Sequence, residues 1–317
     1  MIMNFITLES GVKFSEIALG AGGIGPVERD DFYFKLMDRY VELGGTTFDS
    51  ARIYGGGECD FAIGRWLKSR GCRDNVTVIT KGSHPDTKTM FVSRLSDEEI
   101  SYDIDTSLAA MGIECSDIHI LHRDDIRIPA EQIVDSLNKL VTSGKTRSIG
   151  VSNWTASRII QANRYAKEAG KIPVTCTQAH FSLAVTTPQG AGDLTYVPLD
   201  EIETAWYKES RQAVLAFSPQ ARGWFVARAN GKVPKESPRR NYDDWPENHR
   251  RLQRLMKLSA ESGYSLSALT TAYVRDSGMN AVPLCSYSSI EQLEDSLGAL
   301  KFKLTKEQVD YLERGEI

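Results

Sequence analysis

Short apolar runs alternate with amphipathic helical patterns along nearly the whole chain of 317 residues. There are eight such runs, at residues 17–19, 46–48, 76–80, 118–121, 148–151, 174–177, 214–217 and 281–284. In a typical helical segment between them, Ser96 and Glu99 form a capping box at the start and Gly112 ends the helix. Alternating strands and helices predict an α/β protein with a parallel sheet, and a count of eight favours one closed (β/α)8 TIM barrel over an open doubly wound sheet.

We expect a single barrel domain over residues 1–317, because no stretch between these segments has the composition of a linker. Residues 3–15 have the pattern of an N-terminal β-hairpin that caps one end of the barrel. Three βα connections are longer than the geometry requires, at residues 83–95, 182–199 and 223–247. Long loops on such a scaffold often shape a pocket. The third connection contains several aromatic residues and is the best candidate for a substrate lid: Trp224, Phe225, Tyr242 and Trp245.

Charge and composition narrow the class of partner. A net charge of −4 gives no basic surface for nucleic acid or anionic lipid. No stretch approaches the roughly 20 apolar residues of a membrane span, and the first residues lack the pattern of a signal peptide. The five cysteines and five histidines show no metal-ligand spacing. We therefore expect a cytoplasmic protein with reduced thiols, no metal and a small-molecule partner, while the oligomeric state stays open.

Polar or aromatic side chains follow directly after most of the predicted strands. They are Asp49 with Tyr54, then Lys81, His122, Ser152 with Asn153, Gln178 and Phe217. Each of them alone has an ordinary structural explanation, such as a helix cap or a core hydrogen bond. In a barrel, however, the carboxyl ends of all strands face the same side, where ligand chemistry gathers. The pattern therefore predicts one pocket that contains all of these side chains.

The first four of these side chains suit proton delivery to a carbonyl group. A phenol with a pKa near 10 is a poor acid at neutral pH, but an ammonium such as Lys81 favours the tyrosinate of Tyr54. Asp49 can hold that lysine, and His122 can orient the carbonyl oxygen. The hydride must then come from a cofactor. Ser152, Asn153 and Gln178 can hydrogen-bond a carboxamide, and Phe217 can stack on its ring; a nicotinamide has both features.

Residues Gly20 to Gly25 match the G-x-G-x-x-G dinucleotide fingerprint. A Rossmann loop of this kind opens directly into a helix and is followed by an acid roughly 20 residues later. Here Pro26 and several charged residues intervene, and the next strand ends at Asp49. We therefore favour a glycine loop whose backbone approaches a ligand at Gly22 and Gly23.

The chain resembles the aldo-keto reductase family, and the matching motifs follow one another in order over nearly the whole chain. The matching segments are LGAGGIG, FDSARIYGGGE, VITKG, DIHILHRDD, SIGVSNW, TQAHFS, VLAFSPQARGW and VPLCSYSSIEQLEDSL. The resemblance implies a (β/α)8 barrel without a Rossmann domain, and the reversible reduction of an aldehyde or ketone by NADPH. Tyr54 would be the general acid, Lys81 and Asp49 would tune it, and His122 would orient the substrate.

The resemblance also implies the cofactor-binding residues. They are Ser152, Asn153, Gln178 and Phe217 at the nicotinamide, Ser218, Gln220 and Arg222 along the pyrophosphate, and Ser286, Tyr287, Ser288, Gln292 and Asp295 at the adenosine. The chain departs from the family pattern at Gln292, where arginine is common. A missing cation weakens the discrimination between NADPH and NADH. We expect NADPH, with NADH as the alternative.

Two other readings of the sequence remain open. The first is a nucleotide-sensing regulatory subunit with little turnover, of the kind that this family supplies to potassium channels. Steady-state oxidation of NADPH with a generic aromatic aldehyde would distinguish an enzyme from such a subunit. The second is a Rossmann dehydrogenase built on Gly20 to Gly25, for which Gly22→Ala would disturb nucleotide affinity more than changes at Gln178 and Asn153.

Overall fold

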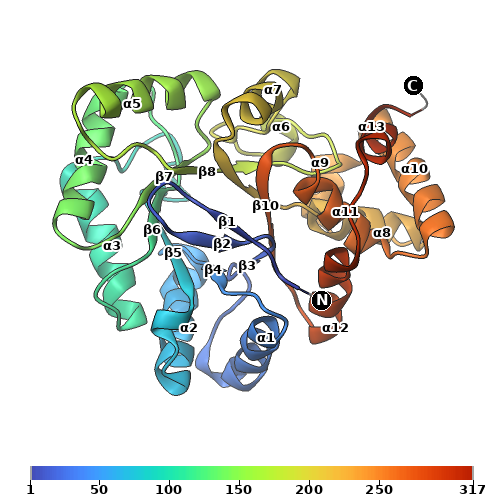
Figure 1. Cartoon of the computed structure of the whole chain (residues 1–317), viewed down its shortest axis with the longest axis horizontal. Coiled ribbons are helices and arrows are strands. Elements are labelled where there is room, and N and C mark those ends of the chain that lie inside the picture. Colours follow the sequence, from blue (N-terminus) through green and yellow to red (C-terminus); the bar gives the residue numbers. More distant parts are fainter. Residues whose placement is uncertain (1, 316–317) are drawn as a thin grey trace.

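Eight parallel strands close into a barrel in the computed structural model, which describes residues 2–315 (Figure 1). The strands are β3 (Ala18–Gly20), β4 (Thr47–Asp49), β5 (Thr77–Gly82), β6 (Ile118–Leu121), β7 (Ile149–Ser152), β8 (Cys176–His180), β9 (Ala213–Phe217) and β10 (Asn280–Cys285). Each pairs in parallel with its neighbours, and β10 pairs with β3 to close the ring. The predicted (β/α)8 barrel is confirmed. The single domain over 1–317 stays a prediction, and residues 1, 316 and 317 lie outside the described part.

The N-terminal hairpin lies across the amino end of the barrel (Figure 1). Its strands, β1 (Phe5–Thr7) and β2 (Lys13–Ser15), pair antiparallel as the sequence predicted. Its apolar side chains form one cluster with residues that point into the barrel. The hairpin contributes Leu8, Val12 and Phe14, and the barrel contributes residues such as Ile79, Ile120 and Leu215. This burial closes the barrel at its amino end, because apolar surface is removed from water on both partners.

Helices surround the barrel (Figure 1). They are α1 (Asp30–Glu42), α2 (Glu58–Arg70), α3 (Asp97–Met111), α4 (Ala130–Thr142), α5 (Ala156–Glu168), α6 (Pro188–Ala191), α7 (Glu201–Ser210), α8 (Trp224–Ala229), α9 (Glu236–Tyr242), α10 (Pro246–Ser262), α11 (Leu266–Arg275), α12 (Ile290–Leu297) and α13 (Lys306–Arg314). The start of α3 shows how the sequence sets a boundary. The Ser96 hydroxyl accepts from the Glu99 N–H at 3.2 Å, the Glu99 side chain accepts from the Ser96 N–H, and Gly112 ends the helix with φ 63°.

The main apolar core lies between the strands and the helices. Phe48 of β4 packs against Tyr40 of α1 and Trp66 of α2, with ring centres 5.4 and 4.9 Å apart. Burying one such side chain stabilises the fold by about 1.5–3 kcal/mol. The helices therefore fix the strands from outside, which leaves the carboxyl ends of the strands free to present polar groups. No described helix combines the length and the apolar character that a membrane crossing needs.

Candidate active site

Four side chains from the carboxyl ends of β4, β5 and β6 meet at the centre of the barrel. The Lys81 Nζ lies 2.5 Å from the Asp49 Oδ2, and both side chains are at most 1% exposed. The same Nζ lies 4.8 Å from the centre of the Tyr54 ring, at the start of the 3-10 turn η2 (Tyr54–Gly57). The His122 ring meets the Tyr54 ring edge to face, with centres 5.6 Å apart. The structure thus brings together the four residues that the sequence singled out for proton transfer.

Burial and neighbouring charges together set the protonation of Tyr54 and Lys81. It raises the pKa of Tyr54 above its ordinary value of 10, and the Lys81 ammonium opposes this rise without reversing it. Burial alone would lower the pKa of Lys81, but attraction to Asp49 and Tyr54 outweighs it, so that this pKa is raised. At neutral pH Tyr54 therefore keeps its proton and Lys81 is charged. The sequence predicted that Lys81 lowers the phenol pKa, but it could not show that burial is the larger effect.

His122 is neutral. Burial, together with the Lys81 and Arg123 cations, lowers its pKa well below 6.5. Its carbonyl oxygen accepts from Asn153 Nδ2 at 3.2 Å and from Arg123 Nη1 at 2.8 Å, which fixes the residue in place. Its ring Nδ1 is buried and has no hydrogen-bond partner within residues 2–315. A neutral imidazole still has one N–H, which it can donate to a substrate oxygen.

A cavity of about 570 Å³ is lined by Asp49, Tyr54 and His122 and reaches most of the predicted cofactor residues; Lys81 pairs with Asp49 but does not line the cavity. Those that line it are Gly22, Gly23, Asp49, Ser152, Asn153, Gln178, Phe217, Ser218, Arg222 and Ser286. Gln178 Nε2 donates to Asp49 Oδ1 at 2.8 Å, so the amide oxygen of Gln178 is the end that can still accept from a ligand. Phe217 is half-buried at the end of β9, with the ring of Tyr196 5.4 Å away.

Comparison with known proteins places this arrangement in a family. The family model described as "Aldo/keto reductase family" matches residues 16–316. The chain belongs to the aldo/keto reductase family. Its members are oxidoreductases, and this aldo/keto reductase is therefore an oxidoreductase as well.

Two relatives and one solved structure illustrate the similarity. The chain is 27% identical to Schizosaccharomyces pombe Aldo-keto reductase yakc, NADP(+), over 85% of this chain and 78% of the relative. It is 24% identical to norsolorinic acid reductase A of Aspergillus parasiticus, over 99% of this chain and 80% of the relative. A crystal structure of the thermostable aldo-keto reductase Tm1743 with the inhibitor epalrestat has the same fold, with a TM-score of 0.75, 20% identity, and coverage of 99% of this chain and 100% of that one.

The glycine loop of this aldo/keto reductase does not belong to a Rossmann unit. It follows barrel strand β3 and leads through the turn η1 (Val27–Arg29) into α1. A Cβ atom at Gly22 would lie 3.8 Å from the Tyr54 ring, and one at Gly23 would meet nothing within 4 Å. Neither glycine has a positive φ. A side chain at Gly22 would therefore contact Tyr54, one at Gly23 would face open space, and no backbone conformation requires glycine at either position.

The strand ends of the reductase carry backbone strain. Six described residues other than glycine have a positive φ, and five of them follow β5, β7 or β9: Ser83, Asn153, Ser218, Ala221 and Arg222. Such a conformation costs on the order of 1–3 kcal/mol for each residue and tends to occur at functional sites. Asn153 is held in it by the protein, since its Nδ2 donates to Ser152 Oγ at 3.0 Å and its Oδ1 accepts from the Val197 N–H at 3.2 Å.

Most of the residues predicted to bind the pyrophosphate and the adenosine do not line the cavity. Gln220 does not line the cavity, because its amide donates to Ser267, Thr271 and Ser296 between helices. Ser288 Oγ donates to Gln292 Oε1 at 2.9 Å on the exposed surface. Asp295 is also exposed, on α12, whereas the Tyr287 hydroxyl is buried without a partner among the described residues. Of the five residues predicted for the adenosine, only Ser286 lines the cavity.

The long connection at 223–247 is not the lid that its aromatic residues predicted. It forms α8 and α9, and Trp224, Phe225 and Tyr242 are buried. The Trp224 Nε1 donates to Asp243 at 2.7 Å, and the Tyr242 hydroxyl bonds His180 Nε2 at 3.1 Å. These aromatic rings pack inward because burying them stabilises the fold. No residue of the 223–247 connection lines the cavity.

Four polar side chains of the cavity wall were not predicted from the sequence: His84, Arg123, Asp193 and Tyr196. Arg123 Nη2 lies 2.8 Å from Asp193 Oδ2, and the His84 ring lies 4.8 Å from that of His122. The Tyr196 hydroxyl is buried and has no partner in the described part of the chain. His84 lies three residues after Lys81, and Arg123 directly follows His122. Their positions after strand ends could therefore have indicated that they line the pocket. Tyr196 lies in the 182–199 connection, where nothing local marks it.

Proposed function

We propose that this protein reversibly reduces an aldehyde or ketone to an alcohol, with NADPH as the hydride source and Tyr54 as the proton donor. The cluster of Asp49, Tyr54 and His122 at the cavity, with Lys81 buried against Asp49 and Tyr54, carries this proposal. Two relatives are named as reductases, which agrees with the same chemistry. NADH is the alternative donor, because Gln292 provides no cation at the position where the family often has arginine.

The cavity fits a nicotinamide nucleotide. Ser152 and Gln178 offer a hydroxyl and an amide oxygen to a carboxamide, and Phe217 offers a ring face beside them. Arg222 lines the same cavity, and its side chain bonds the Ser237 hydroxyl at 2.6 Å but no carboxylate within residues 2–315. That cation can therefore bind a phosphate. One relative is named with NADP(+), which supports the phosphorylated form. When bound, the nucleotide supplies the hydride.

Residues of the chain supply the proton, stabilise the tyrosinate and orient the substrate oxygen. Tyr54 is protonated at neutral pH, so it can give its proton to the carbonyl oxygen as that oxygen gains negative charge. The Lys81 ammonium stabilises the resulting tyrosinate, and Asp49 keeps Lys81 charged and in place. The neutral His122 donates its N–H to the same oxygen and sets its orientation. In the reverse direction, the tyrosinate takes the proton of the alcohol.

Removing the Tyr54 hydroxyl tests the proposal. With NADPH and an aromatic aldehyde, Tyr54→Phe is expected to lower kcat by about a thousandfold, because general acids contribute roughly 10²–10⁴. Its Kd for NADPH, from a fluorescence titration, should stay close to that of the unchanged protein, since no cofactor contact is removed. Tyr102→Phe, at a site that is 59% exposed, is the matched control and should not change kcat. Full turnover of the Tyr54 variant would refute the assignment.

A regulatory role is the second candidate function. A nucleotide sensor would bind NADPH tightly and oxidise it hardly at all with any aldehyde. The intact buried proton-transfer group counts against this role, because a buried charged pair is costly to keep without a use. Tight NADPH binding without steady-state oxidation over a panel of aldehydes would support the sensor and contradict the enzyme.

A further inference from the structure

Residues 218–222, directly after β9, form a turn that concentrates backbone strain, here called the β9 turn. Three of the six described residues other than glycine with a positive φ lie in it: Ser218 at 55°, Ala221 at 49° and Arg222 at 52°. Such a conformation persists only where the surrounding structure holds it. Ser218 and Arg222 line the catalytic cavity, and Arg222 is the cation proposed to bind a phosphate. The turn must therefore keep this conformation for both side chains to face a ligand.

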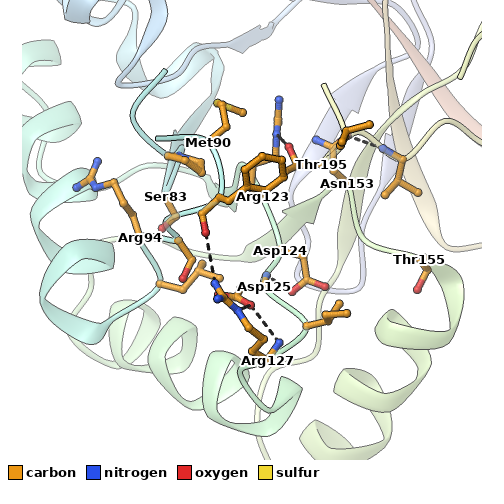
Figure 2. A pocket seen from close by; sticks show the side chains of 17 residues that line it. Ser83, Met90, Arg94, Arg123, Asp124, Asp125, Arg127, Asn153, Thr155 and Thr195 are labelled. Carbon is orange, nitrogen blue, oxygen red and sulfur yellow. Dashed lines mark hydrogen bonds and ion pairs between the residues drawn. The ribbon is translucent and has the colours of Figure 1, made fainter. Parts of the chain in front are cut away.

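A strained residue at a strand end can be held by its own side chain. Asn153 is an example, because its amide oxygen accepts from a backbone N–H of the next βα connection at 3.2 Å (Figure 2). The strained residues of the β9 turn have no buried anchor of this kind. Ala221 has no polar side chain, and within residues 2–315 the Ser218 Oγ has a single bond, a long one of 3.4 Å from Arg222 Nε. Arg222 Nη1 bonds Ser237 at 2.6 Å, but Arg222 is exposed.

Gln220, inside the β9 turn, supplies a buried anchor. Its Nε2 lies 2.7 Å from Ser296 Oγ, 3.0 Å from Thr271 Oγ1 and 3.2 Å from the carbonyl oxygen of Ser267. The Thr271 hydroxyl donates to the same Ser267 carbonyl at 2.8 Å, so it accepts from Gln220. Thr271 and Ser296 are at most 2% exposed and belong to α11 and α12. The side chain of Gln220 therefore ties the turn to two helices outside the barrel.

We propose that Gln220 is a positioning residue for nucleotide binding. It holds the β9 turn in its strained conformation before the nucleotide arrives, so that Ser218 and Arg222 already face the phosphates. Binding then needs less ordering of the turn, which tightens it. This inference rests on the proposed function, since it assigns the turn to NADPH. The sequence predicted a direct contact between Gln220 and the pyrophosphate, whereas the role proposed here is indirect, because the amide donors are engaged between the helices.

Gln220→Met tests this inference, because it keeps an unbranched side chain of similar length and removes the donors. Its Kd for NADPH, from a fluorescence titration, should rise about tenfold, since the lost hydrogen bonds contribute on this order. At saturating NADPH, kcat should change by no more than about twofold, because the proton-transfer residues are untouched. The matched control is Gln212→Met, at the amino end of β9. Gln212 is also half-buried and donates to the Val174 carbonyl at 3.2 Å, and its loss should leave the Kd unchanged. An unchanged Kd in Gln220→Met would overturn the inference.

Ala221→Gly distinguishes positioning of the turn from general support of the fold. Glycine adopts a positive φ without the steric cost that alanine has, so the turn then needs less restraint. In the Gln220→Met background, Ala221→Gly should therefore lower the Kd for NADPH again, by about threefold or more. A side chain that only supports the packing of α11 and α12 would give no such rescue. A Kd that Ala221→Gly leaves unchanged or raises further in this background would overturn the inference.

Removing the acceptors gives a second, independent test. Thr271→Val with Ser296→Ala leaves Gln220 in place but deletes both hydroxyls that it bonds. This pair should raise the Kd for NADPH about as much as Gln220→Met does, and it should add nothing in the Gln220→Met background, because the same bonds are lost. Additive effects would overturn the inference. The pair also gives the answer by itself if Gln220→Met does not fold.

The outcomes separate this inference from the proposed function. If none of these changes alters the Kd for NADPH while aldehyde reduction still depends on Tyr54, the inference is wrong and the proposed function stands. If the unchanged protein binds neither NADPH nor NADH, both are wrong.

Discussion

Asp49 connects two parts of the site at the scale of a single residue. Its Oδ2 lies 2.5 Å from Lys81 Nζ, and its Oδ1 accepts from Gln178 Nε2 at 2.8 Å. One carboxylate therefore holds both the amine proposed to stabilise the tyrosinate and the amide proposed to face the nicotinamide. Breaking such a buried pair costs about 3–5 kcal/mol, because the remaining charge is left uncompensated. In the proposed function, the same acid would set the geometry of proton transfer and of cofactor binding.

The pKa shifts at Tyr54 and His122 predict a flat pH profile for carbonyl reduction. The pKa of Tyr54 is raised above 10, so its proton is present throughout the neutral range and is lost only above pH 10. The pKa of His122 is lowered well below 6.5, so the imidazole stays neutral. We expect kcat/KM to be constant between pH 6 and pH 9, and to fall above about pH 10. A titration with a midpoint between pH 6 and pH 9 that disappears in His122→Gln or Tyr54→Phe would contradict these protonation states.

At the scale of elements, α3 positions two loops of the site through one buried acid. Asp103 is 1% exposed, and its Oδ2 accepts from the Ser83 N–H at 2.7 Å, directly after β5. Its Oδ1 lies 2.7 Å from Arg52 Nε, two residues before Tyr54, and 2.9 Å from Arg94 Nη2, near the end of the 83–95 connection. The helix thus fixes the loop that contains Tyr54 and the loop that contains His84.

Asp103→Asn is expected to weaken this arrangement. It keeps the shape of the side chain but removes the charge that both arginines face, so the free energy of unfolding should fall by about 3 kcal/mol. As a positioning change, it should raise KM for the carbonyl substrate several-fold more than it lowers kcat. Asp105→Asn, on the exposed side of the same helix, is the control and should do neither. Urea unfolding and steady-state kinetics measure both effects, and an unchanged KM would show that α3 only supports the fold.

Local sequence patterns predicted the strands and the ends of α3, because apolar runs and helix-capping residues act on their immediate neighbours in the chain. The eight apolar runs lie within three residues of the barrel strands, and Ser96, Glu99 and Gly112 bound α3 as expected. The prediction failed where distant residues decide. Trp224 turns inward toward Asp243, and Gln220 bonds Thr271 and Ser296 instead of lining the cavity. The sequence placed Lys81 beside Tyr54, but the pKa of the phenol depends on burial by the whole barrel.

At the scale of the whole molecule, three buried imidazoles link folding to pH. Burial lowers the pKa of His119 and His180 to about 3, and that of His122 well below 6.5. Below pH 6.5 the unfolded chain takes up protons at these histidines and the folded chain does not. Their contribution to stability is therefore complete above pH 6.5 and is lost progressively as the pH falls toward 3.

We expect the free energy of unfolding to be about 4 kcal/mol lower at pH 5.5 than at pH 8, with roughly equal contributions from the three imidazoles. Urea denaturation at pH 8, 6.5 and 5.5 measures this difference. His180→Phe should remove about a third of it. A pH dependence that His180→Phe leaves unchanged would show that this imidazole accepts a proton in the folded state.

Because the hairpin closes the amino end of the barrel, the proposed cofactor and substrate would both enter the cavity from the carboxyl end of the strands. When two ligands share one entrance and one lies behind the other, they are released in the reverse of the order in which they bind. A cofactor held beside Gln178 and Phe217, as proposed, would then bind before the substrate and leave after the product. Its departure would then set the pace of the whole cycle whenever the chemistry itself is fast.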